Sequence, residues 1–168
     1  EILFEKSEMV IASSDLLLKK VKNKNAKKSL MLKNAGDFDH FNKAFSKLEI
    51  PRDIKKIKKP IIGYYGAIAK WFDANLLEKL LKDHIDKSFV LIGRIDNHDV
   101  EYLSRKYKNL HLFGEKKYSE LPNYLEQFDV CLIPFVINDL IRATNPVKIY
   151  EYFAAGKPVV ATKIPELE

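Results

Sequence analysis

Residues 60–168 alternate between short apolar runs and helical patterns, and this alternation constrains the fold more than any other feature of the sequence. Short connections between alternating strands and helices favour a parallel sheet with right-handed crossovers. We therefore predict an α/β fold with a doubly wound parallel sheet, in which ligands bind beyond the carboxyl ends of the strands. The expected strands cover 60–66, 88–93, 109–114, 129–135 and 158–162, and the expected helices cover 75–85, 99–107, 118–128 and 146–155.

The first third of the chain has a different organisation. A strand is expected within 8–14, a capped helix over 15–21, a second strand over 29–33 and a helical piece over 39–48. Residues 49–59 are polar and basic and include a proline, which is typical of a linker. We therefore predict a partial domain over 1–48, a linker over 49–59 and a second domain over 60–168.

Composition limits the class of protein. An apolar content of 46% is enough for a real core, and no apolar stretch is long enough to span a bilayer. The single cysteine, Cys131, offers no disulfide framework, so we expect a reducing, cytoplasmic compartment. Residues 1–59 carry 15 Lys and Arg against 8 Asp and Glu, so the net charge of +6 belongs to this part. Its lysines lack interleaved aromatic residues, which favours contact with anionic lipid over nucleic acid.

The stretch Thr144–Thr162 reads as a helix aimed at a ligand, followed by a buried central strand. Asn145 can cap this helix, and Pro146 suits its first turn. Lys148 and Glu151 share one helix face because they are three residues apart. The positive end of a helix with a lysine beside it suits an anion such as phosphate. The alternative is an exposed Lys148–Glu151 ion pair worth roughly 0.3 kcal/mol.

Small residues mark the carboxyl ends of the expected strands. Gly63 and Gly66 flank the end of the first strand, Gly93-Arg94 ends the second, and Gly114-Glu115 ends the third. Glycines at these places let a ligand approach backbone N–H groups closely, although glycines also punctuate strand ends in many proteins of this class. No dinucleotide fingerprint or P-loop follows these glycines, and the four histidines lack metal-ligand spacing.

In this order, the motifs resemble the carboxyl-terminal half of GT-B glycosyltransferases of the retaining family 4 type. The matching segments are IGYYGAIAKWFD, FVLIG, LHLFGEKKYSELPNYLEQFDVCLIPF and PVKIYEYFAAGKPVVAT. The earlier segments EMVIASSDLLLKKV and LMLKNAGDFDHFNKA are similar to the end of that family's amino-terminal, acceptor-side domain. The resemblance therefore implies a nucleotide-sugar (donor) binding domain, Rossmann-like, over 60–168.

The resemblance also implies roles for individual residues. Glu151 matches the second glutamate of the family's E-x7-E element, which accepts hydrogen bonds from ribose hydroxyls. Lys148, with the amides near Asn145, Pro146 and Val147, would hold the diphosphate without a metal. The loop from Gly66 to Lys70 would lie against the phosphates, with Gly114 and Glu115 beside the base and Arg94 a further donor-binding candidate.

Two positions depart from the family pattern. Ala143 stands where the first glutamate of E-x7-E would be, and Asp139 in the preceding loop is the candidate catalytic replacement. Ala67 stands where many relatives carry an arginine, and Lys70 could supply that charge.

The function expected from the resemblance is transfer of a hexose from a UDP- or GDP-linked donor, with retention and without a separate cofactor. The acceptor would be a glycan or a lipid-linked molecule of cell-envelope polysaccharide biosynthesis, reached by peripheral contact with the inner membrane face. Residues 1–48 and a donor domain truncated at its carboxyl end would make an excised piece that does not turn over by itself. The alternative is a non-catalytic doubly wound module that binds an anionic ligand or a protein partner.

Overall fold

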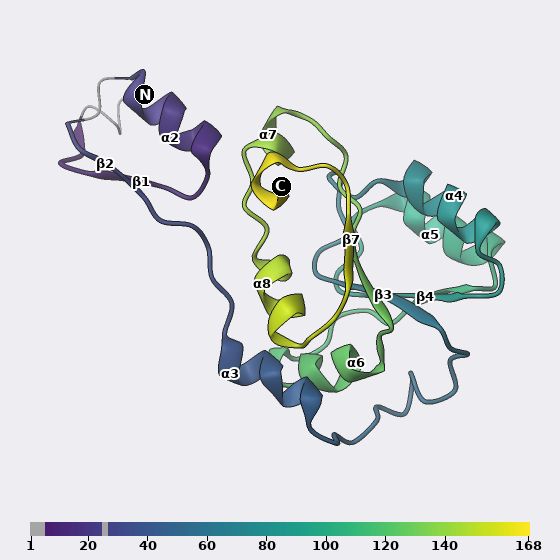
Figure 1. Cartoon of the computed structure of the whole chain (residues 1–168). Coiled ribbons are helices and arrows are strands. Elements are labelled where there is room, and N and C mark those ends of the chain that lie inside the picture. The colour runs from purple at the N-terminus through teal and green to yellow at the C-terminus, as the bar shows by residue number, and fades with distance from the viewer. Residues whose placement is uncertain (1–5, 25–26) are drawn as a thin grey trace. The chain divides into compact units, whose positions relative to one another are not determined.

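A computed structural model describes residues 6–24 and 27–168 (Figure 1). Contacts between Cα atoms divide the chain into two compact units. The larger unit contains Gly36–Val136 and Lys148–Thr162, and the smaller unit contains the described residues up to Ala35 with Ile137–Val147 and Lys163–Glu168. Among the described residues, no helix combines the length and the apolar character needed to cross a membrane.

The larger unit is built on a five-stranded parallel sheet in the order β5-β4-β3-β6-β7, which confirms the predicted fold class. Helices cover both faces: α4 and α5 lie on one side of β3 and β4, and α6 lies on the other side (Figure 1). The chain runs outward from β3 through β4 to β5 and then returns to β6, so the order reverses between β3 and β6. The strands are β3 Ile61–Tyr65, β4 Ser88–Ile92, β5 Leu110–Leu112, β6 Val130–Ile133 and β7 Val159–Ala161, and the helices are α4 Ala74–Asp83, α5 His98–Lys106, α6 Leu121–Gln127 and α8 Val147–Ala154.

The local sequence explains the central elements. All five residues of β4 are buried, as expected of an apolar run covered by helices on both faces. The Asp73 side chain caps α4 by accepting a hydrogen bond from the Leu76 N–H at 2.8 Å. Leu77 and Leu81, one turn apart, are fully buried beneath that helix.

The last strand departs from the prediction. β7 (Val159–Ala161) was expected to be central, and this expectation is wrong, because β7 lies at the edge of the sheet and pairs with β6. The Val160 side chain is 59% exposed. An apolar run shows that a segment can be a strand, whereas its place in the sheet depends on long-range pairing. The segment expected to be an irregular loop before α8 contains a short helix, α7 (Asp139–Arg142), capped by Asn138.

In the first part of the chain, the contact boundary between the units lies at Ala35–Gly36, and the domain bounds 1–48, 49–59 and 60–168 stay a prediction. The short helices α3 (Phe38–Phe41) and η1 (Asn42–Phe45) pack against α6. Phe41 is fully buried there, and its burial helps to hold α3 and η1 against the larger unit.

The predicted linker 49–59 is also fastened to the larger unit. Ile54 is 2% exposed, and the Asp53 carboxylate accepts hydrogen bonds from the Tyr124 hydroxyl at 3.0 Å and from Lys116 Nζ at 2.6 Å. The functional roles expected of 1–48 and 60–168 stay predictions.

The smaller unit joins segments that are far apart in sequence. Strands β1 (Val10–Ala12) and β2 (Ser29–Met31) form a parallel pair, connected through α2 (Asp15–Lys22). The Glu166 carboxylate, in η3 (Pro165–Leu167), accepts a hydrogen bond from the Asp15 N–H at 2.7 Å. Its other oxygen lies 3.1 Å from Lys33 Nζ. A single carboxylate therefore ties the last residues of the chain to its first strands and helix.

Gly63 was expected to give a ligand room at the end of β3, and this interpretation is wrong. A Cβ atom at position 63 would overlap the ring of Phe128. Phe128, which follows α6, is 1% exposed, so the space beside Gly63 is filled by the core. Gly63 is a packing residue of the central strand.

We predict that Gly63→Ala lowers the free energy of unfolding by about 1–3 kcal/mol, because the added methyl group overpacks a closed core. Urea denaturation measures this change. In the background Phe128→Leu, which makes room at that place, the same substitution should cost distinctly less. An equal cost in both backgrounds would contradict the packing role.

Candidate functional site

Three loops meet at the carboxyl edge of the sheet. The Gly66 N–H, after β3, donates to the Ile92 carbonyl at 2.8 Å, and the Gly93 N–H, after β4, donates to the Gly114 carbonyl at 2.8 Å. These backbone bonds tie the ends of β3, β4 and β5 together. On its other side β3 pairs with β6, and the strand order reverses between these two strands, which is the usual ligand site in such sheets.

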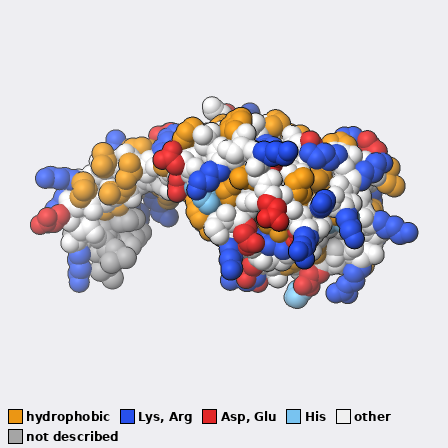
Figure 2. All heavy atoms as spheres, turned by 90° about the horizontal axis from the view of Figure 1, so that it is seen from below, with side chains coloured by type: hydrophobic (Ala, Val, Ile, Leu, Met, Phe, Trp, Pro, Cys, Tyr) orange, Lys and Arg blue, Asp and Glu red, His pale blue; other side chains and the backbone are white. Residues whose placement is uncertain are grey.

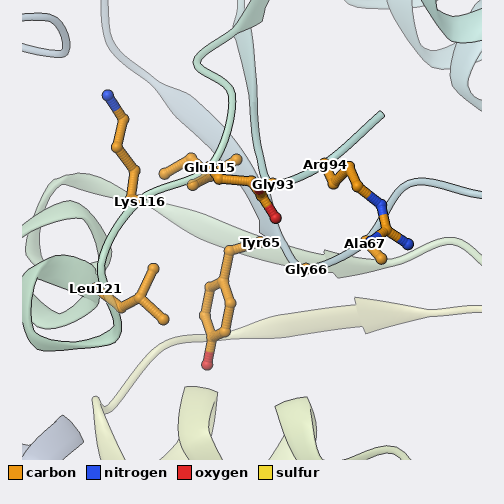
Figure 3. Close-up of a pocket in the computed structure, with 9 residues that line it drawn as sticks. Tyr65, Gly66, Ala67, Gly93, Arg94, Glu115, Lys116 and Leu121 are labelled. Atoms are coloured by element: carbon orange, nitrogen blue, oxygen red, sulfur yellow. The ribbon is translucent and has the colours of Figure 1, made fainter. Parts of the chain in front are cut away.

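A cavity of about 240 Å³ opens between these loops (Figure 3). In Figure 3 the Arg94 side chain extends beside Ala67, while Leu121 of α6 lies beside the Tyr65 ring. The Arg94 Nε donates to Asp96 Oδ2 at 2.8 Å, and its side chain is 65% exposed. The lining consists of Tyr65, Gly66, Ala67, Ile92, Gly93, Arg94, Glu115, Lys116 and Leu121.

Two glycines allow the loops to come this close. Gly66 has φ = 128° and Gly93 has φ = 138°, a conformation that residues with a Cβ rarely adopt. A Cβ atom at position 93 would also overlap the Gly66 carbonyl group. The floor of the cavity is therefore bare backbone.

Lys148, near the start of α8, lies against this floor. A Cβ at position 66 would lie 2.7 Å from Lys148 Nζ, and Nζ is 5.5 Å from the centroid of the Tyr64 ring. Within the described part of the chain, Lys148 forms no ion pair with a carboxylate. Burial lowers the pKa of Lys148 below its usual value, and the Glu151 carboxylate only partly opposes that shift. The arrangement holds the Lys148 ammonium, whose N–H groups can donate hydrogen bonds to a ligand, at the carboxyl end of β3.

Glu151 lies one turn further along α8 and is 8% exposed. Its Oε2 accepts a hydrogen bond from the Tyr65 hydroxyl. The backbone at Gly36 packs against it, since a Cβ there would lie 3.2 Å from Glu151 Cγ. The exposed Lys148–Glu151 ion pair, considered as an alternative above, is therefore not formed.

Tyr65 is the site residue that sequence reasoning missed. It ends β3, lines the cavity and bonds to Glu151, so it connects the glycine loop with α8. The alternation of side chains along β3 puts Tyr65 on the same face as Ile61 and Gly63. Its position next to Gly66 is the signal that could have revealed it.

The structure brings only some of the predicted residues to the cavity. Gly66, Arg94 and Glu115 line it, and Gly114 contributes the carbonyl that binds the Gly93 N–H. Lys70 is exposed and does not belong to the lining.

The remaining predicted residues belong to the smaller unit. Asn145 Oδ1 accepts a hydrogen bond from the Asn34 N–H at 3.0 Å, Pro146 is buried, and α8 begins at Val147. Asp139 is exposed at the start of α7 and borders a shallow cavity that includes Leu16 and Leu17. The functional roles assigned to these residues from the sequence stay predictions.

Residues 59–168 match the family model described as "Glycosyl transferases group 1". The matched region covers well over half of the chain and includes the whole five-stranded sheet. The chain belongs to this family, and its larger unit is a GT-B glycosyltransferase domain with a Rossmann-like sheet.

Relatives extend the comparison. The chain is 27% identical over 169 residues to TuaH of Bacillus subtilis (strain 168), which is named "Putative teichuronic acid biosynthesis glycosyltransferase TuaH". The match covers 97% of this chain and 42% of that protein. HepE of Anabaena, in complex with UDP and glucose, superposes with a TM-score of 0.72 at 17% identity, covering 99% and 47% of the two chains. The catalytic domain of starch synthase IV from Arabidopsis thaliana, bound to ADP and acarbose, gives a TM-score of 0.71 at 15% identity, covering 96% and 40%. The two solved structures show the fold, and this chain spans less than half of each of the three proteins.

We predict that Lys148→Met raises the melting temperature at neutral pH, because it removes a desolvated charge that forms no ion pair with any residue the structure describes. Above the lowered pKa of Lys148, the folded protein releases this proton before the unfolded chain does, so the wild type gains stability as the pH rises toward about 10.4. The advantage of the variant should therefore shrink in alkaline buffer. Melting curves at several pH values measure it, with the exposed Lys79→Met as control. A lower melting temperature at neutral pH would contradict the unpaired charge.

Proposed function

We propose that the larger unit binds a nucleoside diphosphate sugar and serves transfer of its hexose, with retention as in family 4, to a glycan or lipid-linked acceptor. The observation that carries this proposal is the close approach of Lys148, a part-buried cation, to the backbone of Gly66, which follows β3 near the point where the strand order reverses. Family membership supports the reaction class, because the chain belongs to the group 1 glycosyl transferases.

The chemistry of donor cleavage explains why such a cation is useful. When the bond between the sugar and the diphosphate breaks, negative charge develops on the departing phosphate. A preorganised ammonium in a partly water-excluded place stabilises that charge. We assign this task to Lys148, which lies against Gly66, with the Arg94 guanidinium of the cavity lining as a second cation.

We assign binding of the nucleoside to two carboxylates, those of Glu151 and Glu115. Glu151 would accept hydrogen bonds from the ribose hydroxyls, and Glu115, with the backbone at Gly114, would lie beside the base. The donor would be linked to UDP or GDP and need no further cofactor. HepE was solved with UDP, and starch synthase IV was solved with ADP, which supports a nucleoside diphosphate as the ligand of this fold.

The remaining assignments follow from the resemblance found in the sequence. The amides near Asn145, Pro146 and Val147 would add to the diphosphate site, and Lys70 would approach the phosphates from the loop after Gly66. Asp139 is proposed as the carboxylate that takes the place of the missing glutamate at Ala143. Cell-envelope polysaccharide biosynthesis on the cytoplasmic side is the proposed setting, supported by the relation to TuaH.

We predict that Glu151→Ala weakens binding of UDP or GDP roughly tenfold to a hundredfold, the range expected for a lost hydrogen bond to a charged group. Isothermal titration calorimetry on the complete natural polypeptide measures the affinity. The exposed Glu49→Ala is the matched control and should bind as the wild type does. Unchanged affinity in Glu151→Ala would refute the ribose assignment.

A non-catalytic binding module is the competing function, and Ala143 at the position of the family's first glutamate favours it. Release of nucleoside diphosphate from a panel of UDP- and GDP-sugars, followed on the complete polypeptide with and without glycan acceptors, separates the two. Nucleotide binding without any donor turnover would support the module. The chain of residues 1–168 alone is proposed to bind donor without turnover.

The sequence placed peripheral contact with an anionic membrane in the lysine-rich residues 1–59, and we propose that Lys56 and Lys58 of this segment make the contact together with further lysines of the larger unit. Figure 2 shows Lys and Arg side chains spread over one face, with carboxylates between them. A cavity of about 640 Å³ gathers several lysines beside Ile85, whose side chain is 82% exposed. Lysines around an exposed apolar side chain suit an anionic lipid surface, because each lysine near such a surface contributes about 1 kcal/mol to the binding free energy. The lysines are Lys56, Lys58, Lys87, Lys106 and Lys108.

We predict that replacing Lys56, Lys58 and Lys108 by glutamate abolishes co-sedimentation with vesicles containing phosphatidylserine, because attraction becomes repulsion. The control replaces Lys19, Lys20 and Lys22, which belong to the last turn of α2, and should keep more of the binding. Failure of the wild type to sediment with these vesicles would remove the membrane proposal.

A further inference from the structure

We propose that Tyr65 is a positioning residue for the donor site: its hydroxyl holds one oxygen of Glu151 so that the other oxygen is presented to the ribose. The proposal rests on the proposed function, since it needs a nucleoside at this edge of the sheet. It assigns a specificity role to a residue that lies between the cavity and α8.

The first observation is the hydrogen bond itself. The Tyr65 hydroxyl donates to Glu151 Oε2 in a buried place. Burial raises the pKa of Tyr65 far above its usual value, and the nearby Tyr152 and Glu151 raise it further. The phenol therefore stays protonated and remains a donor at physiological pH.

The second observation is that the Tyr65 ring is fixed from several sides. Its ring stacks on Phe41 with centroids 6.1 Å apart and meets Tyr152 edge-on at 5.2 Å. The Tyr65 N–H also donates to the Tyr152 hydroxyl at 3.3 Å. A ring held in this way gives its hydroxyl one direction, and that direction is toward Glu151.

The third observation concerns the carboxylate. A carboxylate offers about four acceptor sites on its two oxygens, and Tyr65 occupies one of them on Oε2. Glu151 is 8% exposed, so without the phenol its charge would lack this buried donor and the side chain would be free to turn. Oε1 is thus oriented by a bond made at the other oxygen.

The test uses Tyr65→Phe, which keeps the ring and both aromatic contacts. Calorimetry on the complete natural polypeptide compares whichever of UDP and GDP the wild type binds more tightly with its 2′,3′-dideoxy counterpart, which lacks both ribose hydroxyls. The wild type should prefer the ribonucleotide. In Tyr65→Phe this preference should fall by roughly threefold to tenfold, part of what a charged hydrogen bond contributes, while affinity for the dideoxy compound stays within about twofold.

Tyr107→Phe is the matched control. It removes a tyrosine hydroxyl that bonds to a different carboxylate, Glu78, at 2.8 Å, so the preference for the ribonucleotide should be unchanged. A merely structural role of Tyr65 would weaken both ligands equally, and that outcome would overturn the proposal. Additive losses in the double variant Tyr65→Phe with Glu151→Ala would overturn it as well, because residues acting through each other should couple.

The outcomes separate this proposal from the function on which it rests. A wild type that binds neither UDP nor GDP would remove both. A wild type that prefers the ribonucleotide, loses the preference in Glu151→Ala and keeps it in Tyr65→Phe would overturn the role of Tyr65 alone. Thermal melts of each variant verify that a changed affinity does not come from partial unfolding.

Discussion

The close approach of Lys148 to the backbone at Gly66 is the contact on which the rest of the site depends. It needs a glycine without a side chain at the end of β3, a second glycine at position 93 that lets the β4 loop cross it, and a helix that begins near the switch point of the sheet. Parallel strand order supplies the last condition, because β3 and β6 end side by side where the order reverses. The fold thus brings an ammonium group and bare backbone together in one place.

This arrangement has a cost in stability that only a ligand would offset. A lysine whose pKa burial lowers, and which forms no ion pair within residues 6–24 and 27–168, destabilises the folded state. The Glu151 carboxylate only partly opposes the lowering of this pKa, and its Oε2 accepts a hydrogen bond from the Tyr65 hydroxyl. An anion such as a diphosphate would complete the site by supplying the missing negative charge. Strained, charged and desolvated groups commonly gather at functional sites for this reason.

The sequence predicted the architecture well because the signals for it are local. Runs such as 88–92 are apolar throughout, and Asp73 caps a helix whose apolar stripe is regular, so strands and helices could be placed before their packing was known. The position of β7 at the edge could not be predicted in this way, because an apolar run of three residues does not reveal how many neighbours the strand has. Within the site, Gly66 and Lys148 were found from strand-end and helix-start patterns. Tyr65 was missed because its partner Glu151 lies 86 residues away.

A crystal of the complete natural polypeptide soaked with UDP or GDP would show whether Lys148 holds the diphosphate. We expect the diphosphate within hydrogen-bond reach of Lys148 Nζ, about 3 Å, and over the backbone at Gly66. We also expect the ribose to face Glu151. A nucleotide bound elsewhere on the sheet edge, with Lys148 still against the Tyr64 ring and no phosphate beside it, would refute this role of Lys148.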